Sequence, residues 1–253
     1  MTDLTISLLH LALKPGALRE NCALVEQGIC ASAQRGADLV IAPELCISGY
    51  EFPQLIGAGW IATYPDEWAR RIAALASSLN LPVLFGHAER GANGRSHNTA
   101  FMLNGAGELI GRHRKINTHA ERWADPGVEI APVSWKGLSL GILICSDAYS
   151  REVADTHKSK GAHLLLSPSA WGPGLNGPAG EWEQRTMDTG LPLIVCNRTG
   201  LERSLNFGGA ESLVIHKGAR LLSHSSKESA SLTLKWSLER MLPSSTEFEV
   251  LYL

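Results

Sequence analysis

Hydrophobic and polar residues follow two different periods along this chain, and the two periods predict strands interleaved with helices. The apolar segments 5–13 (TISLLHLAL) and 37–44 (ADLVIAPE) are typical of strands. Between them, apolar residues recur at helical intervals and predict an amphipathic helix that ends near residue 36: Leu18, Cys22, Val25 and Ile29. The chain therefore opens as strand, helix, strand.

A second helix is predicted to begin near Pro65 and Asp66, which are residue types that favour helix starts. Its apolar face repeats the same spacing through Trp68, Ile72, Leu75 and Leu79. Two further helices are expected at about residues 150–160 and 178–190.

The rest of the chain is dominated by strands. Two segments are predicted to form hairpins, 98–115 around an Asn-Gly-Ala-Gly turn and 212–224 around Lys217-Gly218. The other apolar runs are expected to be single strands: 81–87, 138–145, 162–171, 191–200 and 229–238. Strands that alternate with helices and include hairpins indicate an α/β layered sandwich of mixed sheets covered by helices, rather than an eight-unit barrel. No linker or repeat divides the sequence, so residues 1–253 are predicted to form a single domain.

Composition and charge narrow the class of protein. The 253 residues are 44% hydrophobic with a formal net charge of −2, and no basic run is present, so nucleic-acid binding has no electrostatic support. The first residues lack the features of a signal peptide, and no apolar stretch is long enough to span a membrane. Five scattered cysteines without CxxC spacing are typical of a reducing compartment. We therefore expect a cytoplasmic protein with no membrane partner.

Three predicted strands end in an ionisable side chain: Glu44 after DLVIAP, Lys115 after ELIGRHR and Cys145 after LGILI. Taken singly, each has an ordinary explanation. Cys145 could fill the core, Glu44 could cap a helix or lie in solvent, and Lys115 could be a surface residue. Strand ends are nevertheless rigid positions where functional groups gather in layered α/β folds.

Together, these three residue types are sufficient for amide or nitrile chemistry without a metal. A thiol needs a nearby base or cation to attack, and a carboxylate can take its proton and later activate water. An ammonium can stabilise the oxyanion of a tetrahedral intermediate, helped by a backbone N–H just after the cysteine.

The segments PELCISGY, GRHRKIN and LGILICSD resemble, in order and spacing, the three signature motifs of the carbon–nitrogen hydrolase, or nitrilase, superfamily. The resemblance extends over nearly the whole chain. It implies a four-layer α-β-β-α sandwich of two mixed sheets flanked by helices. It also implies a homodimer or higher homo-oligomer, for which the β-prone end EFEVLYL could cross to a neighbouring subunit or form a local edge strand.

The same resemblance implies roles for individual residues. Glu44 would be the general base, Lys115 the stabiliser of the oxyanion, and Cys145 the nucleophile that forms a thioester. Glu121, in KINTHAERWADPG, would orient the lysine and the substrate amide, unless it is only a surface residue. The backbone N–H of Ser146 would be the second oxyanion donor.

The residues after the cysteine bear on the substrate. Cys145-Ser146-Asp147 is similar to the amidase and carbamoyl-hydrolase branches, whereas nitrile-cleaving members more often carry Cys-Trp-Glu. Tyr149 stands where many amidases have an arginine that holds a substrate carboxylate, which argues against an ω-amide of a dicarboxylic acid. Tyr149 could instead stack, donate a hydrogen bond or only pack, and Trp171 could line the pocket or fill the core.

We therefore predict a hydrolase of non-peptide carbon–nitrogen bonds that cleaves a small linear amide or N-carbamoyl compound to an acid and ammonia. The alternatives are a nitrilase, an amide-forming acyltransferase and a non-catalytic binding member of the fold. The nine histidines lack paired metal-ligand spacing, so no metal site is predicted. The reaction is expected to need only side chains and water, with no cofactor.

Overall fold

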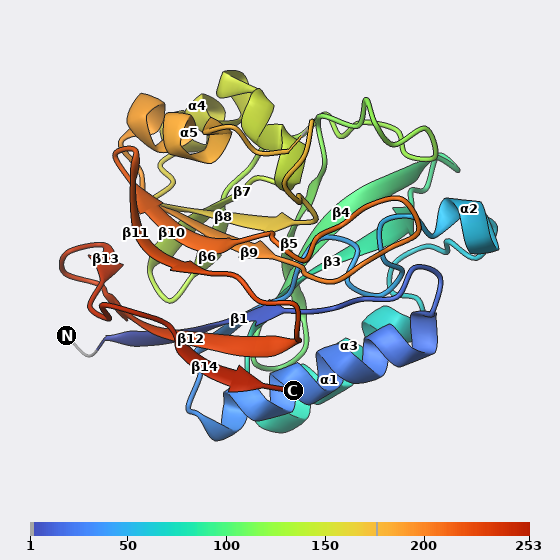
Figure 1. Ribbon diagram of the computed structural model, residues 1–253, viewed down its shortest axis with the longest axis horizontal. Helices are drawn as coiled ribbons and strands as arrows, with labels where there is room; N and C mark the ends of the chain where they lie inside the picture. The colour runs from blue at the N-terminus through green and yellow to red at the C-terminus, as the bar shows by residue number, and fades with distance from the viewer. Residues whose placement is uncertain (1–2, 176) are drawn as a thin grey trace.

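The computed structural model describes residues 3–175 and 177–253 as two β-sheets between helices, in four layers (Figure 1). In chain order, the elements of the first half are β1 (Leu4–His10), α1 (Leu18–Gln34), β2 (Leu39–Ile41), α2 (Pro53–Ile56), α3 (Glu67–Leu79), β3 (Val83–Arg90), β4 (Ser96–Leu103), β5 (Leu109–Arg114), β6 (Val133–Trp135) and β7 (Leu138–Ile142). Those of the second half are the 3₁₀ helix η1 (Cys145–Tyr149), α4 (Arg151–Ser159), β8 (Leu164–Ser169), α5 (Glu181–Thr189), β9 (Leu193–Asn197), β10 (Ser212–His216), β11 (Ala219–His224), β12 (Ala230–Ser237), β13 (Leu242–Pro243) and β14 (Glu249–Tyr252).

Both sheets are mixed, as predicted. The first follows the order β13-β12-β1-β2-β3-β4-β5, with β14 also paired to β12, and the second follows β11-β10-β9-β8-β7-β6. Helices α1 and α3 cover the outer face of the first sheet, and α4 and α5 cover the outer face of the second (Figure 1). The four-layer α-β-β-α arrangement is therefore confirmed.

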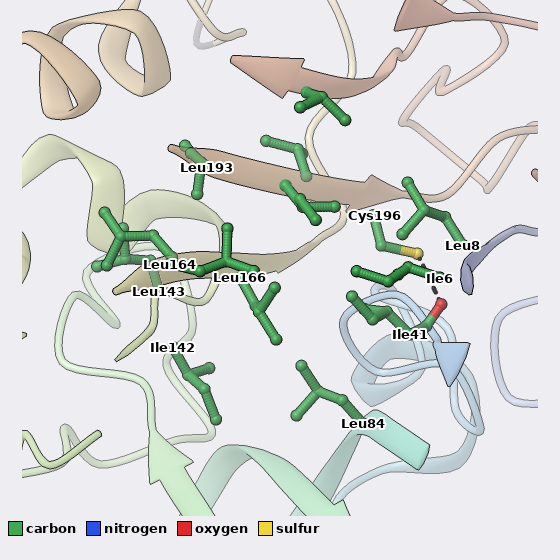
Figure 2. Close-up of a cluster of buried hydrophobic side chains, with 14 of the residues drawn as sticks. Ile6, Leu8, Ile41, Leu84, Ile142, Leu143, Leu164, Leu166, Leu193 and Cys196 are labelled. Atoms are coloured by element: carbon green, nitrogen blue, oxygen red, sulfur yellow. Dashed lines mark hydrogen bonds between the residues drawn. The ribbon is translucent and has the colours of Figure 1, made fainter. Parts of the chain in front are cut away.

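The main core lies between the two sheets. Figure 2 shows leucine and isoleucine side chains from β1, β2 and β3 facing those of β7, β8 and β9. In β2 the period of two is visible, because Leu39 and Ile41 face this core while Val40 packs toward α1 and α3. Each such fully buried side chain contributes about 1.5–3 kcal/mol to folding. The strands are thereby held rigidly on both faces.

The predicted elements are present, with shorter strands than the apolar runs suggested. The run 37–44 contains only three strand residues, Leu39–Ile41, and the run 138–145 ends as a strand at Ile142. Asp66 caps α3 by accepting a hydrogen bond from the backbone N–H of Ala69 at 2.9 Å. Short strands matter for the site, because Glu44 and Cys145 follow the strands in turns instead of lying within them.

The C-terminal segment forms β14, which pairs antiparallel with β12 of the same chain. Within this chain EFEVLYL therefore forms a local edge strand, and a contact of this end with a neighbouring subunit stays a prediction. None of the helices in the described ranges is long and apolar enough to cross a membrane.

Candidate active site

Glu44 lies in the turn that follows β2 and is completely buried. The turn packs tightly against β3, because a Cβ atom added to Gly86 would lie only 2.6 Å from the Glu44 Cα. Both carboxylate oxygens of Glu44 accept hydrogen bonds: Oε1 from Lys115 Nζ at 2.6 Å and Oε2 from the backbone N–H of Ala170 at 2.9 Å. Glu44 is thus fixed inside the protein rather than exposed to solvent or capping a helix.

Lys115 directly follows β5 and is also buried. Its Nζ donates to Glu44 Oε1 and to Glu121 Oε1, so that one ammonium lies between two carboxylates. Asn98 from β4 joins the same two carboxylates, donating to Glu44 Oε1 at 2.7 Å and to Glu121 Oε2 at 2.9 Å. Glu121 is buried too, which excludes the interpretation as a surface residue. We call these four residues the acid–lysine cluster.

Burial and charge shift the acidities within this cluster. Burial raises the pKa of Glu44, the neighbouring Lys115 ammonium opposes that shift, and Glu121 adds to it. Burial by itself would lower the pKa of Lys115, but the carboxylates of Glu121 and Glu44 outweigh it and raise that pKa well above its ordinary value. The lysine is therefore held as a cation, and Glu44 binds a proton more readily than an ordinary glutamate.

Cys145 is the first residue of η1, where the chain turns sharply after β7. Its φ of 48° lies in the left-handed region, which non-glycine residues rarely adopt and which recurs at functional sites. The Sγ atom is 3.8 Å from the carbonyl oxygen of Ala170, whose own N–H binds Glu44. Burial first and the Glu44 charge second raise the pKa of the thiol, against the effect of Lys115. The resting group is a neutral thiol beside a base.

Asp147 joins the turn that carries the cysteine to the turn that carries the lysine. It accepts hydrogen bonds from the backbone N–H groups of Ile144 at 3.0 Å, Ile116 at 2.9 Å and Asn117 at 2.8 Å. His113 Nε2 lies 2.9 Å from its Oδ2, and this hydrogen bond helps to lower the pKa of Asp147 against the opposing effect of burial. One buried carboxylate therefore fixes the relative position of two site residues from different sheets.

Ser146 adds a second connection between these turns. Its hydroxyl donates to the Asn117 carbonyl at 3.0 Å, and the Asn117 side chain donates back to the Ser146 carbonyl at 3.1 Å. These bonds hold Ser146, the residue that follows the cysteine, on the turn that follows Lys115.

Tyr50 lies over the acid–lysine cluster. Its ring centroid is 5.9 Å from Lys115 Nζ, and its hydroxyl donates to Glu121 Oε1 at 3.4 Å. Tyr50 and Glu121 also border a cavity of about 580 Å³, together with Glu51, Pro53, Gln54, Ala120, Arg122, Trp123, Ser204 and Leu205. The cluster is therefore adjacent to an open approach from solvent.

The two aromatic residues singled out from the sequence lie on the cysteine side. Trp171 is buried in the core between the sheets and makes edge contacts with Tyr149 and Trp182, each at 5.0 Å between ring centroids. Tyr149 is half exposed. The structure supports packing for both residues, and Trp171 follows Ala170, which touches the thiol.

Sequence reasoning missed three residues that build the site. Asn98, Tyr50 and the structural role of Asp147 were not singled out, although Tyr50 and Asp147 stand in the quoted motifs. A signal for Asn98 existed: it is a polar residue at the start of the apolar segment NTAFML, and it and Lys115 are the two ends of the predicted hairpin. In residues 3–175 and 177–253 the structure shows no group of three or more His, Cys, Asp or Glu side chains arranged to hold a metal ion.

Comparison with known proteins shows which family this chain belongs to. The carbon–nitrogen hydrolase family model matches residues 5–235. A protein described as hydrolase in pqqF 5′ region, from Pseudomonas protegens, is 32% identical over 139 residues, which are 53% of this chain and 48% of that protein. Omega-amidase NIT2 of Xenopus tropicalis is 22% identical over 94% of this chain and 90% of its own.

The chain is also similar to part of longer proteins and to a solved structure. Glutamine-dependent NAD(+) synthetase of Xylella fastidiosa is 30% identical over 83% of this chain, which spans only 40% of the synthetase. The chain thus covers about half or less of several curated relatives. The NitN amidase from Nesterenkonia sp. AN1 has the same fold, with a TM-score of 0.84 and 23% identity over 93% of this chain and 94% of its own. The chain belongs to the carbon–nitrogen hydrolase family.

Proposed function

We propose that this protein is an amidohydrolase that cleaves a small linear amide, or an N-carbamoyl compound, to an acid and ammonia through a thioester on Cys145. The observation that carries the proposal is the acid–lysine cluster beside the thiol. Glu44 binds Lys115 through one oxygen and the backbone N–H of Ala170 through the other, and the carbonyl oxygen of Ala170 contacts the thiol.

The first half of the reaction uses the proton of the thiol. Cys145 is protonated at rest, so Glu44 takes the proton as the sulfur attacks the carbonyl carbon of R–CO–NH₂. Lys115 Nζ and the backbone N–H of Ser146 stabilise the oxyanion. Glu44 then returns the proton to the leaving nitrogen, and ammonia departs while the thioester remains.

The second half reverses these roles with water. Glu44, again a carboxylate, takes a proton from a water molecule as the oxygen of that water attacks the thioester carbon. The carbon–sulfur bond breaks, the thiol regains its proton and the acid is released. Glu121 stays a hydrogen-bond partner of Lys115 throughout, which keeps the ammonium directed at the oxyanion.

The relatives support an amide as the substrate. In solved structures of mutants of the Nesterenkonia amidase, the active-site cysteine has reacted with an amide compound, by Michael addition of acrylamide in one and by addition of the acetamide moiety of fluoroacetamide in another. Tyr149, in place of an arginine, packs on Trp171, which follows the residue that the thiol contacts, and this favours an uncharged acyl group here. A second candidate substrate is glutamine, because several relatives are glutamine-dependent NAD(+) synthetases.

Ammonia release separates these possibilities. The purified protein and its Cys145→Ala variant are incubated with short aliphatic amides, N-carbamoyl compounds, nitriles and glutamine. We expect release from short amides or carbamoyl compounds by the native protein, and none by the variant. Equal release by Cys145→Ala would refute the mechanism, and release from glutamine alone would select the second candidate.

A further inference from the structure

The carboxamide of Asn98 bridges the two carboxylates that share Lys115. Its Nδ2 atom donates one hydrogen bond to Glu44 Oε1 at 2.7 Å and another to Glu121 Oε2 at 2.9 Å. The side chain is completely buried. Both protons of this amide nitrogen are therefore used on the two carboxylates that the proposed reaction needs.

The strand register places Asn98 in this position. The backbone N–H of Lys115 donates to the Asn98 carbonyl at 2.8 Å, which extends the pairing of β4 with β5 by one residue. On the other side Asn98 pairs with Ala88 of β3. Its Cα is thus fixed beside the lysine backbone in the middle of a paired sheet, and the side chain reaches the carboxylates from a rigid element.

The orientation of the amide follows from charge. In the described part of the chain, Asn98 Oδ1 has no hydrogen-bond partner. The flipped amide would direct that oxygen, an acceptor, at two carboxylates that need donors. Both carboxylates therefore select the orientation in which nitrogen faces them, although it leaves a buried oxygen unpaired.

We propose that Asn98 is a positioning residue that holds Glu44 and Glu121 together as anions on Lys115; the proposal rests on the function proposed above. Two carboxylates in one buried site repel each other, and one ammonium neutralises only one of them. An amide supplies two further donors without adding charge. A carboxylate at position 98 would add repulsion, and an apolar residue would supply no donor.

The consequence for catalysis concerns Glu44 as the base. Its proton affinity depends on the ionisable groups around it, which come from five separate parts of the chain: Lys115 after β5, Glu121 in the next loop, Cys145 in η1, Tyr50, and Arg198 after β9. The hydrogen bond from Asn98 acts with Lys115 to lower the pKa of Glu44 against burial. Without Asn98, protonation of Glu44 shifts to higher pH.

The test compares Asn98→Ala, Asn98→Ser and Asn98→Asp with the native protein. Asn104→Asp is the matched control for Asn98→Asp, since it makes the same chemical change in a surface turn far from the site. Asn104 Oδ1 accepts from the backbone N–H groups of Ala106 and Glu108, as an aspartate also would, and only the bond from Asn104 Nδ2 to the Glu108 carboxylate is lost. Folding of each variant is checked by urea unfolding. The readouts are kcat/KM for the best amide against pH, and the rate of Cys145 alkylation by iodoacetamide against pH, followed on the Cys145 peptide by mass spectrometry.

We expect Asn98→Ala to lower kcat/KM about 100-fold, as misplacement of a catalytic group by about 1 Å does. Its acid limb should move to higher pH, and the acid limb of Asn98→Asp should move furthest. Asn98→Ser keeps one donor and should lie between Ala and the native protein. The control should match the native protein in both readouts.

A folded Asn98→Ala or Asn98→Ser variant with an unchanged acid limb and a kcat/KM within about threefold of native would overturn the proposal. If the native protein releases ammonia from no compound, the proposed function fails. The rate of Cys145 alkylation against pH still tests the role of Asn98 in that case, because alkylation needs only the thiol and its base. A shift of this pH profile in the Asn98 variants supports the proposal, and a profile equal to that of the native protein refutes it.

Discussion

Two buried ion clusters lie on either side of Tyr50, and they differ in whether their charges are balanced. The acid–lysine cluster has two carboxylates and one ammonium next to a thiol. The second cluster pairs Arg198 with Glu202, and both side chains are likewise removed from solvent. The first cluster therefore has one more carboxylate than cations, whereas the second has one of each.

In the second cluster, both charged side chains are bound by backbone groups as well as by each other. Arg198 Nη2 donates to the Leu13 carbonyl at 2.6 Å, and its guanidinium lies 4.4 Å from the centroid of the Phe207 ring. Glu202 accepts from the backbone N–H groups of Tyr50 at 2.9 Å and Glu51 at 2.6 Å. Burial lowers the pKa of Arg198 to about 9, so it stays charged at neutral pH. This cluster anchors the backbone of Tyr50.

The difference indicates what makes a buried ion cluster reactive. A balanced, fully hydrogen-bonded ion pair has no proton to exchange near pH 7. Removing one of its two partners leaves the other charge buried and unpaired. The acid–lysine cluster carries an excess carboxylate whose pKa is raised, beside a thiol that must lose a proton. We therefore expect substitutions in the first cluster to remove activity, whether or not they also lower stability, and those in the second to lower stability with little effect on activity.

The largest expected effect is on activity in Lys115→Met. The variant keeps an unbranched side chain of similar length but loses the cation at the oxyanion, and we expect kcat/KM to fall about 1,000-fold. The measurement is ammonia release by protein shown to be folded by circular dichroism. A fall of less than about tenfold would contradict the role given to Lys115.

The matched change in the second cluster is Arg198→Met. It leaves the buried Glu202 without its cation, so we expect the free energy of unfolding to fall by about 3–5 kcal/mol. Urea unfolding measures this loss. Arg198 also acts electrostatically on Glu44, so kcat/KM of the folded protein is compared above the acid limb, where it should stay within about tenfold of native. If Arg198→Met removed activity and left stability unchanged, the division between the clusters would be wrong.

The acid limb of the pH profile is the next effect in size. Glu44 acts as a base only as a carboxylate, so kcat/KM falls as the pH drops through its folded-state pKa. Because burial and Glu121 raise that pKa, the limb should lie above the ordinary glutamate value of about 4.3. A profile of kcat/KM from pH 4 to 9 checks this, and a limb at or below 4.3 would contradict it.

The smallest expected effect concerns His157, a buried group outside both clusters. Burial lowers its pKa to about 4, so the unfolded chain binds its proton near pH 6.5 but the folded protein does not. The free energy of unfolding is therefore unaffected by the titration of His157 above pH 6.5. It decreases as the pH falls from 6.5 toward 4, by at most about 1.4 kcal/mol per pH unit for this one group. Urea unfolding at pH 7, 5.5 and 4.5 should show a shallower decline in His157→Gln. Parallel curves would contradict the assignment.

The fold was predictable because its strands and helices bury regular faces. The amphipathic spacing of Leu18 through Ile29 and the cap at Asp66 gave α1 and α3 nearly to the residue. The short elements β6, β13 and α2 were missed, since two to four residues carry too little periodicity to be recognised. Strand ends were overestimated because an apolar run continues into the buried turn after β7.

The site was only partly predictable for a similar reason. The strand ends and the motifs singled out Glu44, Lys115 and Cys145, and the structure brings these residues together. Asn98 was missed because its importance depends on strand register, which decides that it pairs beside Lys115. Tyr149 and Trp171 depend on loop conformations that local sequence does not specify.

The central claim is that Cys145 carries the acyl group of the substrate as a thioester. The most direct test is to mix the native protein with a reactive short amide, quench it in acid within the first turnovers, and measure the mass of the peptide that contains Cys145. We predict an added acyl mass on that peptide, discharged on longer incubation as ammonia accumulates, and no addition to the peptides of the other four cysteines. Ammonia release with an unmodified Cys145 peptide at all times, or with the acyl mass on another residue, would contradict the claim.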